Sequence, residues 1–181
     1  VEGPEIPVFD GSAAVFVDRI QKTGLRRLEA KREFLRVTRP IWVGDEDSLL
    51  LALPSPRLRI TFAGEFPCLG FLRKSVAVTP AAFASEIAPA RTFVAEDDIE
   101  DILASGLGKG GSLENVVVLG AESASDSLRS PDEPVRHKIL DLMGDLTFLG
   151  RRLQADIVAV RSGHKQNLAL VQKLLGTEDL R

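Results

Sequence analysis

The sequence is poor in the residues that would place it in several common protein classes. It has one cysteine, Cys68, in 181 residues, which excludes an internal disulfide and suits a reducing compartment. Its longest apolar runs, such as residues 48–53 and 155–160, are far shorter than the ~20 residues that span a bilayer, so we expect no transmembrane segment. Its 26 acidic side chains outnumber the 23 basic ones, so we expect no nucleic-acid partner.

The sequence does contain enough apolar residues to fold. Hydrophobic residues make up 44% and charged residues 27%, a balance typical of a chain with a buried core. The length allows one full domain and at most part of another. We expect no attached signal peptide, because a basic stretch followed by an apolar run is lacking at the start. The first residue is Val1 rather than Met, which suggests a fragment or a processed product.

Short apolar runs between Pro-containing or acidic turns predict strands, and apolar residues at helical spacing predict helices. The predicted strands cover residues 34–37, 48–53, 58–62, 75–78, 115–119 and 155–160. The predicted helices cover residues 12–22, a segment opened by Thr79-Pro80, and residues 95–104, 131–149 and 165–175. The first three strands predict an antiparallel meander. Strands followed by segregated helices favour an α+β fold, a two-layer sandwich with helices on one face of a largely antiparallel sheet.

The helix after Pro131 has the clearest start signals of the chain. Ser130 is a natural N-cap, Pro131 suits the first helical position, and Glu133 completes the spacing of a capping box. One side of this helix carries the apolar residues that we expect to be buried, namely Val135, Ile139, Leu142, Met143, Leu146 and Leu149.

The other side of this helix carries His137, Asp141 and Asp145, which recur every four residues and share an arc of about 80°. An ordinary solvated face is one interpretation. The other is a metal site, because an imidazole and a carboxylate one turn apart can bind the same Zn²⁺ and a second carboxylate can orient another histidine. No third ligand is evident, so the chain alone offers an incomplete metal site.

The second histidine, His164, comes where a loop leads into a helix, in Ser162-Gly163-His164. It is either a surface histidine or a side chain that reaches a cleft. Lys138 and Arg161 would place cations near the two histidines, as an anionic phosphate substrate requires, although exposed basic residues are common. The Gly-rich residues 106–111 precede a strand, whereas a dinucleotide-binding loop follows one. We interpret them as a tight turn that needs positive φ, or as a narrow surface where a ligand passes close to the backbone.

Several segments together resemble one family, the UDP-3-O-acyl-N-acetylglucosamine deacetylases, which are zinc amidases of lipid A synthesis. The resemblance is collinear from Val1 to about Leu175, and its most specific parts are residues 135–146 and Ser162-Gly163-His164. The other matching segments are residues 1–7, 10–13, 90–93 and 110–112. The resemblance implies a UDP-linked acylated glucosamine as substrate and Zn²⁺ as cofactor. It also implies a cytoplasmic location, or the interior of an organelle of bacterial origin.

The resemblance assigns a role to each residue of the histidine constellation. His137 and Asp141 match two zinc ligands of the family. His164 matches the general acid, and Asp145 matches the carboxylate that orients it. Thr92 matches a residue that helps to hold the oxyanion. Hydrolysis of the acetamide is therefore the implied reaction.

The resemblance also assigns substrate contacts. Phe93 matches a residue that contacts the sugar, Lys138 one that meets the diphosphate, and Arg161 a basic residue near the nucleotide pocket. Gly111 and Ser112 fall in a small β-α-β insert that shapes a passage for the acyl chain. Glu65 and Phe66 match an acidic-aromatic pair at the uridine end, but residues 67–70 replace the His-Pro that often follows it in the family.

The family's third zinc ligand and its glutamate base lie in a His-Thr-x-Glu-His motif upstream of the segment that matches Val1. The resemblance therefore implies that residues 1–30 are the tail of a first domain and that residues 31–181 form a complete second domain with part of the active site. We expect the chain alone to be inactive and its partner to be the missing N-terminal half. The alternative is a non-catalytic descendant that acts as a structural or binding subunit.

Overall fold

The computed structural model describes residues 6–106, 108 and 110–176. Three parts of the chain lie outside the described residues. They are residues 1–5, where the resemblance begins, Leu107 and Lys109 of the Gly-rich turn, and residues 177–181. The strands are β1 (Phe34–Arg36), β2 (Ile41–Gly44), β3 (Leu49–Pro54), β4 (Arg59–Phe66), β5 (Gly70–Ala77), β6 (Phe93–Ala95), β7 (Val117–Leu119) and β8 (Arg152–Val160). The helices are α1 (Ala14–Thr23), α2 (Pro80–Ala82), η1 (Phe83–Ile87), η2 (Glu96–Asp98), α3 (Ile99–Ala104), α4 (Glu133–Leu146), η3 (Thr147–Leu149) and α5 (His164–Leu175).

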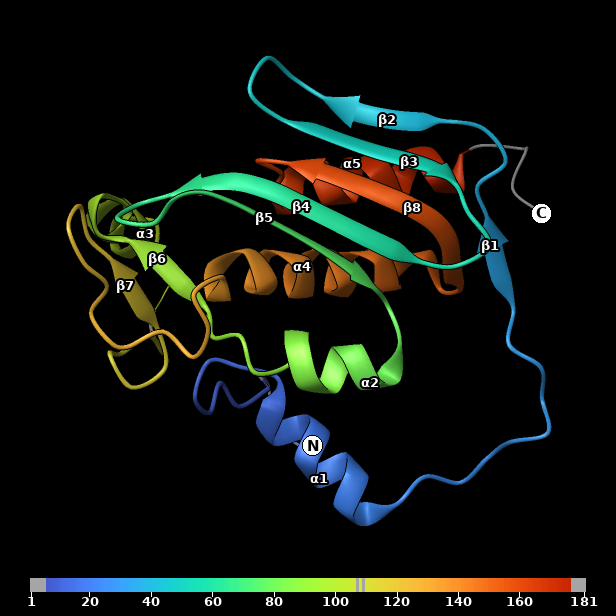
Figure 1. The fold of residues 1–181 in the computed structure, drawn as a ribbon, viewed down its shortest axis with the longest axis horizontal. Coiled ribbons are helices and arrows are strands. Elements are labelled where there is room, and N and C mark those ends of the chain that lie inside the picture. Colours follow the sequence, from blue (N-terminus) through green and yellow to red (C-terminus); the bar gives the residue numbers. More distant parts are fainter. Residues whose placement is uncertain (1–5, 107, 109, 177–181) are drawn as a thin grey trace.

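The main body has two layers, a mixed sheet and the helices α4 and α5 on one of its faces (Figure 1). The strand order is β2-β3-β8-β4-β5, with β1 paired to β8. Residues alternate along β8 between partly exposed and buried, as expected for a strand with one covered face. The core between the layers is formed by apolar side chains from both, including Leu50, Ile60, Ile139, Leu142, Ile157 and Leu170. The α+β two-layer prediction is confirmed.

The predicted meander is wrong, because β8 lies between β3 and β4. It pairs antiparallel to β3 and parallel to β4. The short turns between the first strands suggested direct neighbours, but a turn signal does not identify the partner in the sheet. The last strand is the most regularly apolar on one face, with Leu153, Ala155, Ile157 and Ala159 buried, and it takes a central place over the helices.

A small β-α-β unit projects from one end of the sheet (Figure 1). It consists of β6, the helices η2 and α3, and β7, and its two strands pair in parallel from Phe93 with Val117 to Ala95 with Leu119. The predicted insert is therefore present. Its first strand brings residues 93–95 beside the beginning of α4, next to the candidate site.

The start of α4 differs from the predicted capping box. The helix begins at Glu133 behind Asp132, whose side chain makes no capping hydrogen bond. The Glu133 backbone nitrogen donates to the Ser130 carbonyl at 3.0 Å, and its carboxylate accepts from Arg91 at 2.9 and 3.0 Å instead of reaching back to the N-cap. The carboxylate also accepts from the backbone nitrogen of Arg129 at 2.6 Å, one residue before the predicted N-cap, so its acceptor sites are filled by Arg91 and Arg129.

The helix α1 lies beside α2 and η1, apart from the sheet, and a long extended segment connects it to β1 (Figure 1). None of its residues is buried. Its apolar side chains and the end of α4 line an apolar groove of about 760 Å³. Among the described residues, no helix is both long and apolar enough to cross a membrane.

Candidate functional site

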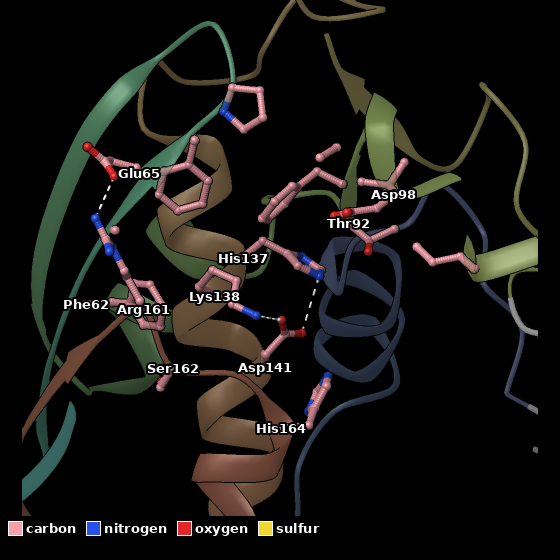
Figure 2. Close-up of a pocket in the computed structure, with 17 residues that line it drawn as sticks. Phe62, Glu65, Thr92, Asp98, His137, Lys138, Asp141, Arg161, Ser162 and His164 are labelled. Atoms are coloured by element: carbon pink, nitrogen blue, oxygen red, sulfur yellow. Dashed lines mark hydrogen bonds and ion pairs between the residues drawn. The ribbon is translucent and has the colours of Figure 1, made fainter. Parts of the chain in front are cut away.

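A cavity of about 630 Å³ lies where the β4–β5 hairpin, β6, α4 and the loop before α5 meet (Figure 2). It is lined by Phe62, Gly64, Glu65, Phe66, Pro67, Thr92, Phe93, Val94, Ala95, Asp98, Ile102, His137, Lys138, Asp141, Arg161, Ser162 and His164. The structure thus brings together most of the residues that the sequence singled out, although they come from segments that are up to about a hundred residues apart.

His137 lies on the side of α4 that faces this cavity and is only 9% exposed. Its Nδ1 is 3.0 Å from the Ala90 carbonyl oxygen. A carbonyl only accepts hydrogen bonds, so in the neutral ring the proton is on Nδ1 and the lone pair is on Nε2. Nε2 lies 3.4 Å from Oδ1 of Asp141, one helical turn further on. The imidazole is therefore oriented with its free nitrogen toward the Asp141 carboxylate.

Asp141 also interacts with the neighbouring cation on its helix. Its Oδ2 lies 3.3 Å from Nζ of Lys138, and Figure 2 shows both contacts converging on this carboxylate. An imidazole Nε2 and a carboxylate are ligands that Zn²⁺ favours, and a carbonyl behind Nδ1 is the usual support for a metal-binding histidine. His137 and Asp141 therefore fit two positions of a zinc site. The described residues contain no cluster of three His, Cys, Asp or Glu that would complete it.

His164 is the first residue of α5. In the view of Figure 2 it lies on one side of Asp141, and His137 lies on the other. Nδ1 of His164 lies 2.7 Å from Oδ2 of Asp145. The histidine side chain is 64% exposed and the aspartate side chain 12% exposed. A largely buried carboxylate thus holds one ring nitrogen, which leaves Nε2 of His164 available at the accessible end.

Sequence reasoning missed Asn167 and assigned no role to Ser162, and both residues lie behind Asp145. Nδ2 of Asn167 donates to Oδ2 of Asp145 at 2.8 Å, and its Oδ1 accepts from Oγ of Ser162 at 3.1 Å. Asn167 is 1% and Ser162 3% exposed. A signal was present, because Asn167 shares the helical spacing of the buried Leu170, Val171 and Leu174. A polar residue within an apolar stripe requires a buried hydrogen-bond partner.

Thr92 and Phe93 form the wall next to the insert. The Thr92 backbone nitrogen donates to the Gly11 carbonyl at 2.8 Å, and its carbonyl accepts from Val117, so this residue is held from two sides. The Phe93 ring packs edge to face against Phe66 and His137, with ring centroids 5.5 and 6.2 Å apart. Beyond them, Val94, Ala95 and Ile102 give the cavity an apolar end, and Asp98 also lines it. The sequence had not singled out these four residues.

Arg161 and Glu65 lie at the opposite wall of the cavity and form an ion pair of 2.6 Å (Figure 2). Both side chains are about half exposed or more. Arg161 adopts φ 49, a left-handed conformation that is uncommon for a residue other than glycine. Its backbone nitrogen donates to the Ala63 carbonyl at 2.9 Å. This sharp turn at the end of β8 aims the guanidinium at the hairpin while the chain passes on to His164.

Gly111 and Ser112 lie in the loop between α3 and β7. Gly111 donates to the Gly108 carbonyl at 2.8 Å, and the Ser112 backbone nitrogen donates to Oδ1 of Asn115 at 2.8 Å. Within the described part of the chain, neither residue belongs to the cavity lining. They form the turn that returns the insert to the sheet.

Comparison with known protein families gives one consistent result. The family model described as LpxC, UDP-3-O-acyl N-acetylglycosamine deacetylase, matches residues 1–176. Among curated proteins, a UDP-3-O-acyl-N-acetylglucosamine deacetylase of Syntrophotalea carbinolica is 43% identical over 99% of this chain and 59% of its own length. A protein of the same name from an Anaeromyxobacter species is 44% identical over 97% of this chain and 59% of its own length. Another, from Chlamydia pneumoniae, is 40% identical over 98% of this chain and 65% of its own length. The chain thus spans about three fifths of the length of these relatives.

Proposed function

Because the chain belongs to the UDP-3-O-acyl-N-acetylglycosamine deacetylase family, we propose that it supplies the C-terminal part of the active site of a zinc-dependent deacetylase. The substrate is a UDP-linked acylated glucosamine of lipid A synthesis, and the reaction is hydrolysis of its acetamide in the cytoplasm. Residues 1–30 belong to a first domain and residues 31–181 form the second. The observation that carries this proposal is the convergence of His137, Asp141 and His164, backed by Asp145, on one cavity.

His137, through Nε2, and Asp141 are the residues that would hold zinc. When bound, zinc supplies a Lewis acid for the amide carbonyl and lowers the pKa of water. The Ala90 carbonyl keeps the proton of His137 on Nδ1, and Lys138 limits the negative charge of Asp141 through its contact of 3.3 Å. The third ligand and the general base come from the N-terminal half, which is the partner of this chain.

His164 is the general acid in this proposal. Asp145 accepts from its Nδ1, so the ring is oriented and Nε2 carries the proton that is given to the departing amine. Thr92 donates to the oxygen on which negative charge develops, since it lines the cavity on the other side of His137. His164 is oriented by Asp145 before substrate binds, and the Thr92 backbone is held by Gly11 and Val117; groups positioned in advance stabilise a transition state most effectively.

The rest of the cavity receives the substrate. Lys138 binds the diphosphate, and Arg161 lies near the nucleotide pocket, where it is paired with Glu65 before substrate binds. Phe93 packs on the sugar, and Glu65 with Phe66 contacts the uridine end. Gly111 and Ser112 act indirectly, by shaping the insert whose apolar residues 94, 95 and 102 form the acyl end of the cavity.

The proposal is tested by acetate release. The chain alone is expected to be inactive, and activity is expected when a separately produced N-terminal half of the enzyme is added. In that mixture His164→Ala lowers kcat by a factor on the order of 10²–10⁴ with zinc retained, as for loss of a general acid, and Asp145→Ala has a smaller effect. Lys165→Ala, a neighbouring exposed position, serves as the control.

Three results would count against the proposal. Turnover by the chain alone would show that the site is complete without a partner. Loss of zinc in His164→Ala would make this histidine a ligand rather than an acid. A stable but inactive complex of the two halves would favour the non-catalytic alternative, a structural or binding subunit.

A further inference from the structure

A buried ion pair with no role in the proposed chemistry ties the start of α4 to the segment before β6. Glu133 is 1% exposed. Its Oε1 accepts from the backbone nitrogen of Arg91 at 2.9 Å and from Nε of Arg91 at 3.0 Å. Its Oε2 accepts from the second guanidinium nitrogen at 3.2 Å and from the backbone nitrogen of Arg129 at 2.6 Å. One carboxylate thus makes four hydrogen bonds.

The guanidinium of Arg91 is engaged on its other side too. It donates to Oδ2 of Asp126 at 2.6 Å and to the Ser127 carbonyl at 2.8 Å. Burial alone would raise the pKa of the Glu133 carboxyl, but the hydrogen bonds from Arg91 outweigh it and hold the pKa below its ordinary value. Arg91 does not line the cavity formed by the described residues. Both charges of the pair are therefore engaged within the protein, and neither side chain lines the cavity formed by the described residues.

The two residues that flank Arg91 both belong to the site. The carbonyl of Ala90 accepts from Nδ1 of His137 at 3.0 Å, and Thr92 lines the cavity. Glu133 and His137 are four residues apart on the same face of α4. Residues 90 and 91 are therefore attached to two successive turns of this helix. Ala90 is attached through the imidazole of His137, and Arg91 through the ion pair with Glu133.

We propose that Arg91 and Glu133 are positioning residues that hold the Ala90 carbonyl against His137 and so set the tautomer of its imidazole. The carbonyl retains the proton on Nδ1, and Nε2 is kept as the nitrogen that faces Asp141. The consequence for catalysis rests on the proposed role of His137 as a metal ligand. The tautomer itself is a property of the chain without metal or substrate.

If the ion pair between Arg91 and Glu133 only stabilised the fold, a different result would be expected. In that case its removal lowers the free energy of unfolding, but the remaining contacts around His137 preserve the Nδ1 proton. A positioning pair changes the balance of the two tautomers at a temperature where the protein is still folded. The two roles are therefore distinguished by the imidazole and not by stability.

The experiment is long-range ¹⁵N–¹H NMR of the metal-free chain at a pH where both imidazoles are neutral. The chain has only two histidines, so a His164→Gln variant assigns the signals. The wild-type chain is expected to show the Nδ1–H form of His137. In Glu133→Gln and in Arg91→Lys the ratio of Nδ1–H to Nε2–H is expected to fall by about tenfold, the effect of losing one well-placed hydrogen bond.

Asp132→Asn is the matched control. It removes a 2.6 Å ion pair with Arg136 from the neighbouring residue at the same end of α4, and it leaves the contacts of residues 90 and 91 intact. Its tautomer ratio is expected to equal that of the wild-type chain. Asp126→Asn removes one outer contact of Arg91 and is expected to change the ratio less than Glu133→Gln does.

Four results would overturn the proposal. One is an Nε2–H form of His137 in the wild-type chain, and another is a wild-type ratio in both folded variants. The third is that Glu133→Gln and Arg91→Lys both lose their fold, as seen by circular dichroism, while Asp126→Asn keeps the tautomer ratio of the wild-type chain. That result would assign the pair to stability alone. The fourth is an equal change in Asp132→Asn. Failure of the deacetylase assay would leave this measurement unaffected, so the two proposals fail separately.

Discussion

At the scale of single residues, each key side chain of the candidate site has one polar atom hydrogen-bonded within the protein and another that is left for the cavity. His137 is held by a backbone carbonyl, His164 by a carboxylate, and that carboxylate by Asn167. Each of these supporting contacts fixes which atom is left to face the cavity. The proposed chemistry therefore depends on supporting residues that do not line the cavity, because an imidazole that rotates about its side-chain bonds presents the wrong nitrogen.

Gly11 is the position at which one added carbon would disturb this arrangement most directly. It has φ 77, and a Cβ there would lie 1.9 Å from the Asn115 carbonyl oxygen and 3.2 Å from Cγ2 of Thr92. We expect Gly11→Ala to lower the free energy of unfolding by about 2 kcal/mol or more, measured by urea denaturation. Activity of the complete enzyme is expected to fall as well, since Gly11 accepts from the Thr92 backbone.

Gly106→Ala separates backbone strain from steric overlap. Gly106 has φ 78, nearly the same value, but among the described residues, its chain neighbours aside, no atom lies within 4 Å of a Cβ placed there. This variant is expected to lose only the roughly 1–2 kcal/mol that a left-handed alanine costs. Equal losses in the two variants would contradict the assigned role of the contact between Gly11 and Asn115.

Asn167 provides a second test at this scale. Asn167→Ala leaves Oδ2 of Asp145 without its amide donor and Oγ of Ser162 without its acceptor. We expect a loss of about 1–3 kcal/mol in stability and a fall of about 10-fold or more in kcat of the complete enzyme, with little change in KM. Ser162→Ala is the control, because it removes only the outer hydrogen bond. An unchanged kcat in a folded Asn167→Ala protein would contradict the interpretation.

At the scale of elements, α4 carries His137, Lys138 and Asp141 of the candidate site and is the element whose sequence was most informative. Its buried stripe and its His-Asp-Asp face follow from helical spacing alone, and the structure has both. The face is not simply solvated, however, because His137 and Asp145 are each 9% exposed. Helical spacing shows which residues share a face, but it does not show what covers that face.

The parts that sequence reasoning missed depend on contacts between distant segments. The place of β8 between β3 and β4 joins residues about a hundred positions apart, and no turn signal encodes such a pairing. Glu133 fitted a local capping box, but a buried arginine 42 residues away took its carboxylate. Local patterns thus predicted the long helices, most of the strands and the candidate ligands, but not the short strands β2 and β6. The sheet order and the supporting contacts required the folded chain.

The start of α4 makes the stability of the chain dependent on pH. The pKa of Glu133 is held below its ordinary value of 4.5, because hydrogen bonds from Arg91 outweigh the effect of burial. Its contribution is fully present above pH 4.5 and is lost as the pH falls through the lower pKa of the folded state, because the unfolded chain takes up the proton first. The difference in unfolding free energy between wild type and Glu133→Gln is therefore expected to shrink as the pH falls below the ordinary value of 4.5.

Urea denaturation at a series of pH values measures this difference. Glu29→Gln, in an exposed segment, controls for the removal of one acidic charge. A difference for Glu133→Gln that stays constant or grows toward low pH would contradict the assigned coupling to Arg91.

At the scale of the whole molecule, the sheet and its two main helices form a scaffold whose site lies at one end. The cavity opens where the hairpin, the insert and the helix ends meet, so four separate segments each contribute groups to it. The apolar groove beside α1 lies elsewhere, against the far end of α4 and the start of β8. The two concave surfaces share no lining residue among those described, so the candidate site and the apolar groove are separate surfaces.

The distribution of ligands within this molecule predicts how strongly it binds zinc. His137 and Asp141 are the two candidate ligands, and a metal held by them alone completes its coordination with water. Loss of a hydrogen bond that only supports a metal ligand already lowers the affinity for the metal by about 10–100-fold. We therefore expect the chain alone to bind Zn²⁺ at least about 100-fold more weakly than the same chain combined with the N-terminal half. Titration calorimetry measures both affinities, and His137→Ala is expected to abolish the weak binding while His164→Ala leaves it unchanged. Tight, stoichiometric binding by the chain alone, lost in His137→Ala, would reveal a third ligand within these residues and would move the metal site entirely into this chain.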